Sequence, residues 1–275
     1  MAVSTIDPFA PIIMMYFSDS PLEVIEQVID ALQDDSSSLK ACSQTCLSLV
    51  PLCRKYLFRS IELTPRPWSS PQLPRLPRKI VLFGRLLDSN PGIADYVQNL
   101  AYQPENPDFE DDDVPRILER LHRVQSLQVI GLDVVWDTLL PRFREYLSNI
   151  IQSPSVTRLE ISYVKNFPIT TFIPCINLLH LTLMKLEGTV VESYEQENSA
   201  SEAIPQLQSF SFGVGGGRYA NALFKARRSN DLPMLDFSNL RTLNVNVGDP
   251  SDLIVTHALI KETEKLETLD YIGMY

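Results

Sequence analysis

The apolar positions of the first sixty residues recur at the spacing of an α-helix. We expect a helix over residues 19–33, with Ser20 placed to cap it and Pro21 at its first position, where a missing N–H costs nothing. Its apolar stripe has five members: Leu22, Ile25, Val28, Ile29 and Leu32. A second helix from about Ser37, a short third helical segment over 52–57 and a strand over 58–63 complete a small helical unit.

From residue 80 onward, short strand patterns alternate with helix patterns. An apolar-x-x-Leu-x-apolar template fits seven segments, in one of which phenylalanine replaces the leucine. Its middle residues are Leu100, Leu127, Leu159, Leu181, Phe210, Leu243 and Leu269. Chance alone gives about seven matches in a chain this apolar, so the spacing of 22 to 33 positions between them carries more weight. Amphipathic helices are expected between several of these strands, over 114–121, 141–151, 218–226 and 251–259.

This alternation predicts an α/β fold in which each repeating unit hides its apolar stripe against its neighbours. We expect a small N-terminal helical unit followed by an irregular β-α solenoid. The repeats resemble degenerate leucine-rich repeats, without the asparagine signature of the regular kind. A doubly wound sheet of the dinucleotide-binding kind is the alternative.

If the strands stack, alternation along each strand decides which side chains face outward. The central outward positions hold Ala101, Gln128, Glu160, Thr182, Ser211, Asn244 and Asp270. The preceding outward positions hold Asn99, Ser126, Arg158, His180, Ser209, Thr242 and Thr268. We expect seven of these residues to bind a partner protein: Gln128, Arg158, Glu160, His180, Thr182, Ser211 and Asn244. A merely solvated face is the alternative, because solubility also requires polar surface.

Five prolines fall between Thr64 and Lys79, which excludes a helix or an inner strand there. We interpret this segment as an extended, semi-rigid linker. The predicted domains are therefore a helical domain over 19–63, a proline-rich linker over 64–79 and a partner-binding repeat domain over 80–275.

The helical domain resembles an F-box, most closely the form common in large fungal families. The resemblance rests on four stretches, Pro21-x-Glu23, Val28-Ile29-x-x-Leu32, Leu39-x-x-Cys42-x-x-x-Cys46 and Leu57-Phe58-Arg59-x-Ile61-x-Leu63. It implies a three-helix motif that docks on the small adaptor subunit of SCF-type cullin–RING ubiquitin ligases. The residues implied in adaptor binding are Pro21, Leu22, Ile25, Val28 and Leu32. Two positions depart from the family pattern, Ser20 where leucine is usual and Leu49 where tryptophan is usual.

Composition narrows the classes of partner. The 275 residues contain 24 Lys and Arg against 34 Asp and Glu, a formal net charge of −10, which disfavours nucleic acid and anionic membranes as partners. No apolar run reaches the roughly 18 residues that span a bilayer, and the N-terminus lacks the basic start of a signal peptide. Four cysteines are too few for a disulfide framework. We expect a soluble protein of the cytoplasm, the nucleus or both.

Candidate chemistry is sparse. The glycine-rich loop at 213–217 lies between a strand and a helix pattern, but the G-x-G-x-x-G spacing of a dinucleotide-binding turn fails at Arg218. Cys42 and Cys46 lie four apart without a second pair of ligands, which favours apolar packing over a metal site. The three histidines stand apart from any nucleophile motif. We expect no catalytic residue, metal or cofactor.

The leading hypothesis is a non-enzymatic substrate-recognition subunit of an SCF-type ubiquitin ligase. The F-box would bind the adaptor and through it the cullin complex, and the repeats would bind an unidentified target protein, while other subunits transfer ubiquitin. An alternative is a protein-interaction scaffold outside any ubiquitin ligase. A third hypothesis is a small α/β enzyme that uses the glycine-rich loop and an acidic residue such as Asp231 or Asp236.

Overall fold

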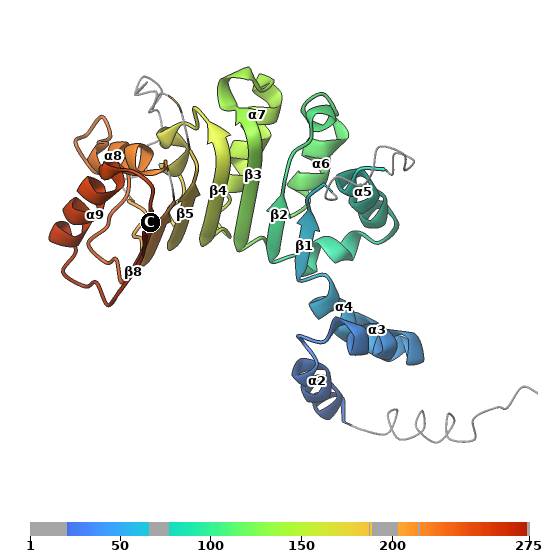
Figure 1. Cartoon of the computed structure of the whole chain (residues 1–275). Helices are drawn as coiled ribbons and strands as arrows, with labels where there is room; N and C mark the ends of the chain where they lie inside the picture. The colour runs from blue at the N-terminus through green and yellow to red at the C-terminus, as the bar shows by residue number, and fades with distance from the viewer. Residues whose placement is uncertain (1–20, 66–76, 187, 189–202, 214, 274–275) are drawn as a thin grey trace, which may run out of the picture. The chain divides into compact units, whose positions relative to one another are not determined.

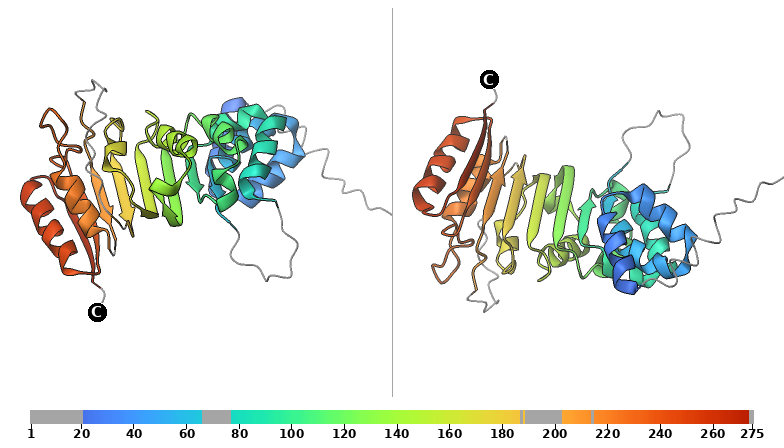
Figure 2. Two further views of the ribbon diagram at one scale, coloured as in Figure 1. Left: turned by 90° about the horizontal axis from the view of Figure 1, so that it is seen from above. Right: turned by 90° about the horizontal axis from the view of Figure 1, so that it is seen from below.

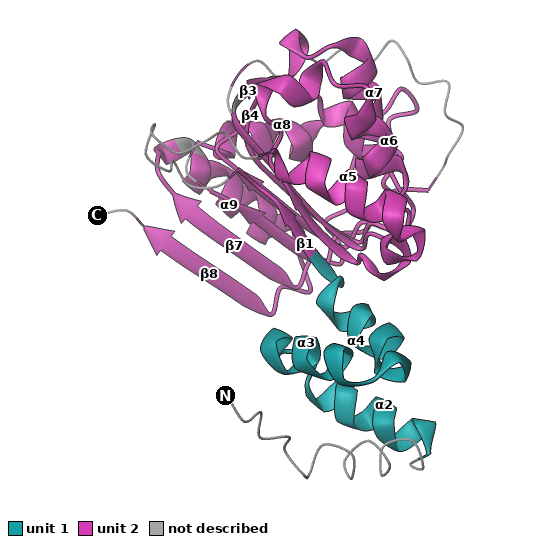
Figure 3. Cartoon of the chain, turned by 90° about the vertical axis from the view of Figure 1, so that its right-hand side faces the viewer, with its two compact units in different colours: residues 1–60 teal, residues 61–275 magenta. Residues whose placement is uncertain are grey.

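The computed structural model describes residues 21–65, 77–186, 188, 203–213 and 215–273. The chain divides into two compact units, residues 1–60 and residues 61–275 (Figure 3). The cap predicted at Ser20 and most of the proline-rich linker lie outside the described residues. The boundary divides the strand predicted over 58–63 equally between the two units, so the stretch that resembles an F-box runs across both.

The described part of the first unit, from residue 21, consists of three α-helices and a short 3-10 helix. They are α2 (Leu22–Ala31), α3 (Ser36–Thr45), η1 (Leu47–Leu49) and α4 (Val50–Leu57). Pro21 precedes the first helix instead of beginning it, and its carbonyl oxygen accepts the Val24 N–H at 3.0 Å. Asp35 caps α3, because one of its carboxylate oxygens accepts the N–H groups of Ser37 and Ser38, both at 3.1 Å.

All of these helical segments contribute to one small apolar core. Its buried members are Ile25, Ile29, Leu39, Leu49 and Cys53. Cys42 and Cys46 pack against this core and stay partly exposed, in the apolar role that the sequence favours for them. Among the described residues, no three His, Cys, Asp or Glu side chains are grouped closely enough to hold a metal ion.

Within the described residues, eight strands form one sheet, and their order in the sheet follows their order in the chain (Figure 1). From β2 to β8, each strand pairs with the next in parallel. All seven strand templates therefore form strands at the predicted places. The strands are β1 (Ser60–Leu63), β2 (Asn99–Tyr102), β3 (Ser126–Val135), β4 (Arg158–Lys165), β5 (His180–Met184), β6 (Ser209–Phe212), β7 (Thr242–Val247) and β8 (Thr268–Gly273).

The described α-helices of the second unit lie against the same face of the sheet (Figures 1 and 2). They are α5 (Lys79–Ser89), α6 (Asp113–Glu119), α7 (Pro141–Ile151), α8 (Gly217–Lys225) and α9 (Pro250–Glu262). The last four confirm the helices predicted from the sequence. The described connections also contain four 3-10 helices: η2 (Pro91–Tyr96), η3 (Asn106–Phe109), η4 (Trp136–Thr138) and η5 (Ile169–Phe172).

Burial alternates along the strands as a one-sided sheet requires. In β2, Leu100 and Tyr102 are buried while Asn99 and Ala101 are partly exposed, and β5, β6 and the first half of β7 repeat this pattern. A doubly wound sheet would reverse its strand order and carry helices on both faces. The described part of the second unit does neither. The prediction of an α/β fold with N-terminal helices and a parallel sheet is thus confirmed.

A buried ionic network fixes the start of α5. Arg78, the residue before this helix, pairs with the carboxylates of Asp108 and Asp111. Asp108 is 1% exposed and also accepts the Tyr102 hydroxyl at 3.1 Å and the Glu105 N–H at 3.0 Å. Burial and the neighbouring Asp108 raise the pKa of Tyr102 well above its usual value, so the phenol remains a hydrogen-bond donor.

A second buried carboxylate joins the loops that precede α8 and α9. Asp252 is fully buried and accepts the N–H groups of Gly217 at 2.9 Å, Gly248 at 2.8 Å and Asp249 at 3.1 Å. A β-carbon added at Gly217 would lie 2.1 Å from the Asp252 Oδ1, so this position requires glycine. Glycine at position 217 therefore allows the backbone to pack closely against Asp252.

Replacing this carboxylate should destabilise the fold. We expect Asp252→Ala to lower the free energy of unfolding by about 3 kcal/mol or more, because three N–H groups lose a charged acceptor. Equilibrium unfolding in urea measures the change. The matched control, Glu264→Ala, removes an exposed carboxylate shortly after α9 and should change the same quantity by less than about 0.5 kcal/mol. A loss below about 1 kcal/mol for Asp252→Ala would contradict this role.

Thiol labelling of the folded chain should proceed at different rates at the different cysteines. The Ser48 hydroxyl, 3.0 Å from Cys46 Sγ, lowers the pKa of that thiol, whereas burial raises the pKa of Cys53 and raises that of Cys175 to about 12. Because the thiolate reacts, iodoacetamide at about pH 8 should modify Cys46 first and Cys175 only after unfolding, as mass spectrometry of the peptides would show. The Ser48→Ala substitution should slow the labelling of Cys46. Equal labelling rates at Cys46 and Cys175 in the folded chain would contradict this prediction.

Candidate functional site

Two rows of mostly polar side chains cross the uncovered face of the sheet. The central row is Ala101, Gln128, Glu160, Thr182, Ser211, Asn244 and Asp270, and each member pairs in register with the next. The preceding row is Asn99, Ser126, Arg158, His180, Ser209, Thr242 and Thr268, in register in the same way. We call these fourteen residues the polar ladder. The register predicted from the sequence is confirmed at every position.

Neighbouring ladder side chains interact across the strands. The Gln128 Nε2 donates to the Glu160 Oε1 at 2.8 Å, which holds both side chains half-buried on adjacent strands. On β7, the Oδ1 atoms of Asn244 and Asn246 are buried and have no hydrogen-bond partner. A buried acceptor without a donor is costly, and a donor supplied by a bound partner would remove that cost.

Arg158 and His180 occupy adjacent, registered positions on β4 and β5. Burial lowers the pKa of His180, and the positive charge of Arg158 lowers it further. The imidazole is therefore predominantly neutral at pH 7, while Arg158 is exposed and charged. With Glu160 beside them on β4, this part of the ladder presents both signs of charge together with neutral donors and acceptors.

The first unit presents apolar side chains around the margins of its core. Of the residues that the F-box resemblance implies in adaptor binding, Leu22 is 58% and Val28 43% exposed, and Pro21 is also exposed. Ile25 is buried in the helical core and Leu32 packs against it, so these two serve the interior of the unit. The stripe read from the sequence as one surface is thus divided by the packing of α3 and α4.

Two further exposed apolar residues were missed by the sequence reasoning. Val24 is 49% and Leu47 89% exposed. Val24 lies four residues before Val28, so both lie on the same side of α2, while Leu22 lies on the opposite side of its buried stripe. We call Leu22, Val24, Val28 and Leu47 the apolar surface residues. A helical projection of α2 reveals Val24, but Leu47 lies in a 3-10 turn with no such period.

The residues considered for an enzymatic role hold structural positions. Asp236 accepts the Ser238 N–H at 2.8 Å and so stabilises a turn. Asp231 lies in a turn with a positive φ of 64°. His122 lies 3.3 Å from the carboxylate of Asp95 at the surface.

No helix within the described residues has the length and apolar character needed to cross a bilayer. In comparisons with known proteins, no family model matches the chain, and a search of curated proteins gives no significant match.

Proposed function

We propose that this chain is a substrate-recognition subunit of an SCF-type ubiquitin ligase. The first unit would bind the adaptor, and the polar ladder of the second unit would bind a target protein. The observation that carries the proposal is a small three-helix unit, with the motif order of an F-box, that exposes four apolar side chains around a formed core. Ubiquitin transfer would belong to other subunits, and the chain would act in the cytoplasm or nucleus by bringing the target into reach.

We also propose that the second unit is an irregular solenoid of the leucine-rich-repeat kind. Three features support this: strand order that follows chain order, one buried middle residue per strand in continuous register from β2 to β7, and helices on a single face. Each feature follows when a strand-plus-helix unit buries its apolar side only against neighbouring units.

The energetic weight of the apolar surface residues is sufficient for selective docking. Full burial of an exposed leucine or valine contributes about 1.5–3 kcal/mol, and these side chains begin about half exposed or more. Each would then contribute about 1 kcal/mol, so loss of two corresponds to a weakening of binding by roughly tenfold or more. Of the two departures from the family pattern, Leu49 is buried and fills the core of the unit, and Ser20 lies outside the described residues.

A scaffold that binds proteins outside any ubiquitin ligase is the second candidate. The unsatisfied acceptor of Asn244 in the ladder, and that of Asn246 two residues further along β7, favour partner binding at this face whatever the first unit binds. Adaptor binding separates the two candidates.

Co-purification of the full chain with the SCF adaptor tests the first unit. We expect the native chain to retain the adaptor and the double variant Leu22→Ala, Val28→Ala to bind it at least about tenfold more weakly, because two exposed anchors are removed. Gln27→Ala alters an exposed polar residue of the same helix and should bind normally. Ser20→Leu should strengthen binding. Absence of adaptor from the native and Ser20→Leu samples alike would leave the scaffold as the function.

If a partner supplies the donor to Asn244, the unpaired acceptor should lower the free energy of unfolding of the chain when no partner is bound. We expect Asn244→Val to raise the free energy of unfolding by about 1 kcal/mol, since a buried acceptor without a donor is replaced by a strand-favouring apolar side chain. Thr182→Val at the corresponding position of β5 should have a smaller effect. Chemical unfolding of both variants gives the comparison, and a destabilised Asn244→Val variant would show that the amide contributes to the fold.

A further inference from the structure

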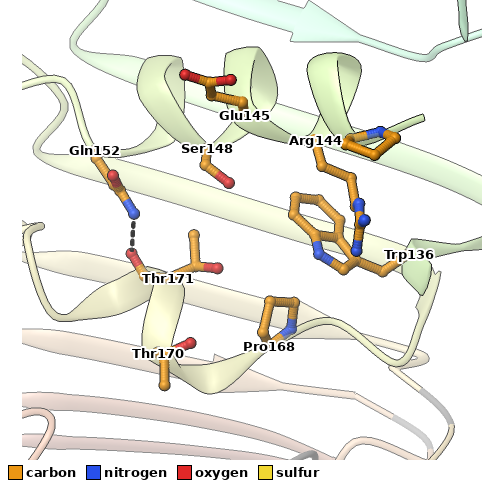
Figure 4. Close-up of a pocket in the computed structure, with 9 residues that line it drawn as sticks. Trp136, Arg144, Glu145, Ser148, Gln152, Pro168, Thr170 and Thr171 are labelled. Atoms are coloured by element: carbon orange, nitrogen blue, oxygen red, sulfur yellow. Dashed lines mark hydrogen bonds between the residues drawn. The ribbon is translucent and has the colours of Figure 1, made fainter. Parts of the chain in front are cut away.

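A pocket of about 310 Å³ lies between α7 and η5, and none of its lining residues belongs to the polar ladder. Its lining comes from η4, which follows β3, from α7 and the residue after it, and from the connection between β4 and β5 (Figure 4). Trp136, Pro141 and Pro168 supply flat apolar walls. The polar lining consists of Arg144, Glu145, Ser148, Gln152, Thr170 and Thr171.

Arg144 brings to this pocket a positive charge that is paired with no carboxylate among the described residues. Its Nε is buried and has no hydrogen-bond partner, and its guanidinium forms no ion pair with the described residues. By contrast, Arg142 on the same helix pairs with Asp112 at 2.5 Å. A buried guanidinium nitrogen without an acceptor is unfavourable, and a bound oxyanion would supply the acceptor.

Neutral donors surround the same space. In Figure 4 the indole nitrogen of Trp136 and the hydroxyl groups of Ser148 and Thr171 point into the pocket that Arg144 lines. Trp136 and Thr171 are each 5% exposed, so their orientation is fixed by packing. The Gln152 Nε2 donates to the Thr171 carbonyl oxygen at 3.2 Å and thereby joins the end of α7 to η5. The donors are therefore held in place before a ligand arrives.

We propose that this pocket binds a phosphomonoester through Arg144, with donation from the Trp136 indole and the Ser148 and Thr171 hydroxyls. Donors that approach from several directions suit a tetrahedral group with three accepting oxygens better than a planar carboxylate with two. The indole and proline walls would contact the carbon portion of the ester. The net charge of −10 disfavours diffuse anion binding, so a saturable site depends on this local arrangement.

Glu145 offers a position at which a substitution should strengthen phosphate binding. It lines the rim, is exposed, and its carboxylate points away from the guanidinium of Arg144 (Figure 4). A phosphate bound beside Arg144 would still feel the repulsion of this charge. Removing the charge should therefore strengthen binding, which a variant damaged in folding would not do.

Isothermal titration of the full chain with phenyl phosphate tests the site. We expect saturable binding with a Kd below about 1 mM. Arg144→Gln should weaken it about tenfold or more, Ser148→Ala should weaken it several-fold, and Glu145→Gln should strengthen it, because charged hydrogen bonds and the rim repulsion change in those directions. The matched control Arg142→Gln should bind within about twofold of the native chain. Circular dichroism and thermal unfolding verify that each variant is folded.

Three outcomes would overturn the proposal. One is no saturable binding of phenyl phosphate by the folded native chain, and another is equal binding by the native chain and a folded Arg144→Gln variant. Benzoate has the same ring with a planar carboxylate, so binding of benzoate as tight as that of phenyl phosphate would overturn the assignment to a phosphate. None of these outcomes bears on the adaptor or the target, because none of the lining residues belongs to the polar ladder or to the first unit.

Discussion

The second unit depends on the parallel pairing of neighbouring strands in one fixed register. At each step, the middle apolar residue of a strand lies beside that of the next strand, from Leu100 in β2 to Leu269 in β8. Because side chains alternate along a strand, a slip by one residue would carry the row to the opposite face. The same register thus fixes both the layer beneath the helices and the polar ladder, so packing determines where the candidate binding residues lie.

The strands could be predicted because their information is local and repeated. A leucine or phenylalanine flanked by apolar residues at set distances recurs at every unit, and the polar residues between them follow by alternation. Four helices of the second unit were predicted to within three residues of their observed limits. Pro141 begins α7 as predicted, whereas α9 begins at Pro250, one residue before the predicted start. The helix α5 (Lys79–Ser89) was not predicted. What could not be read locally is the role of Asp252, whose bond to Gly217 joins residues 35 positions apart.

The two candidate sites also depend on contacts between distant segments, which local sequence patterns do not reveal. In α2, the five-residue stripe was correct as a helical pattern, but the packing of α3 and α4 buries Ile25 and Ile29 and leaves Leu22 and Val28 exposed. The spacing of apolar residues identifies the apolar face of a helix, but it does not show how much of that face the neighbouring helices cover. The pocket near Arg144 has no sequence signal, because its walls come from three segments that meet only in the fold.

The strand β8 shows that the apolar residues of a repeat are not buried by that repeat alone. Leu269 and Tyr271 of β8 fit the template as well as Leu243 and Val245 of β7, yet the β7 pair is buried whereas Leu269 is 45% and Tyr271 52% exposed. The pattern makes a strand, but burial comes from what lies on either side. The seven ladder residues expected to bind a partner lie on β3 to β7, where every strand has a neighbour on both sides. A binding surface on these strands is presented rigidly because its support is shared, and a surface centred on β8 would lack that support.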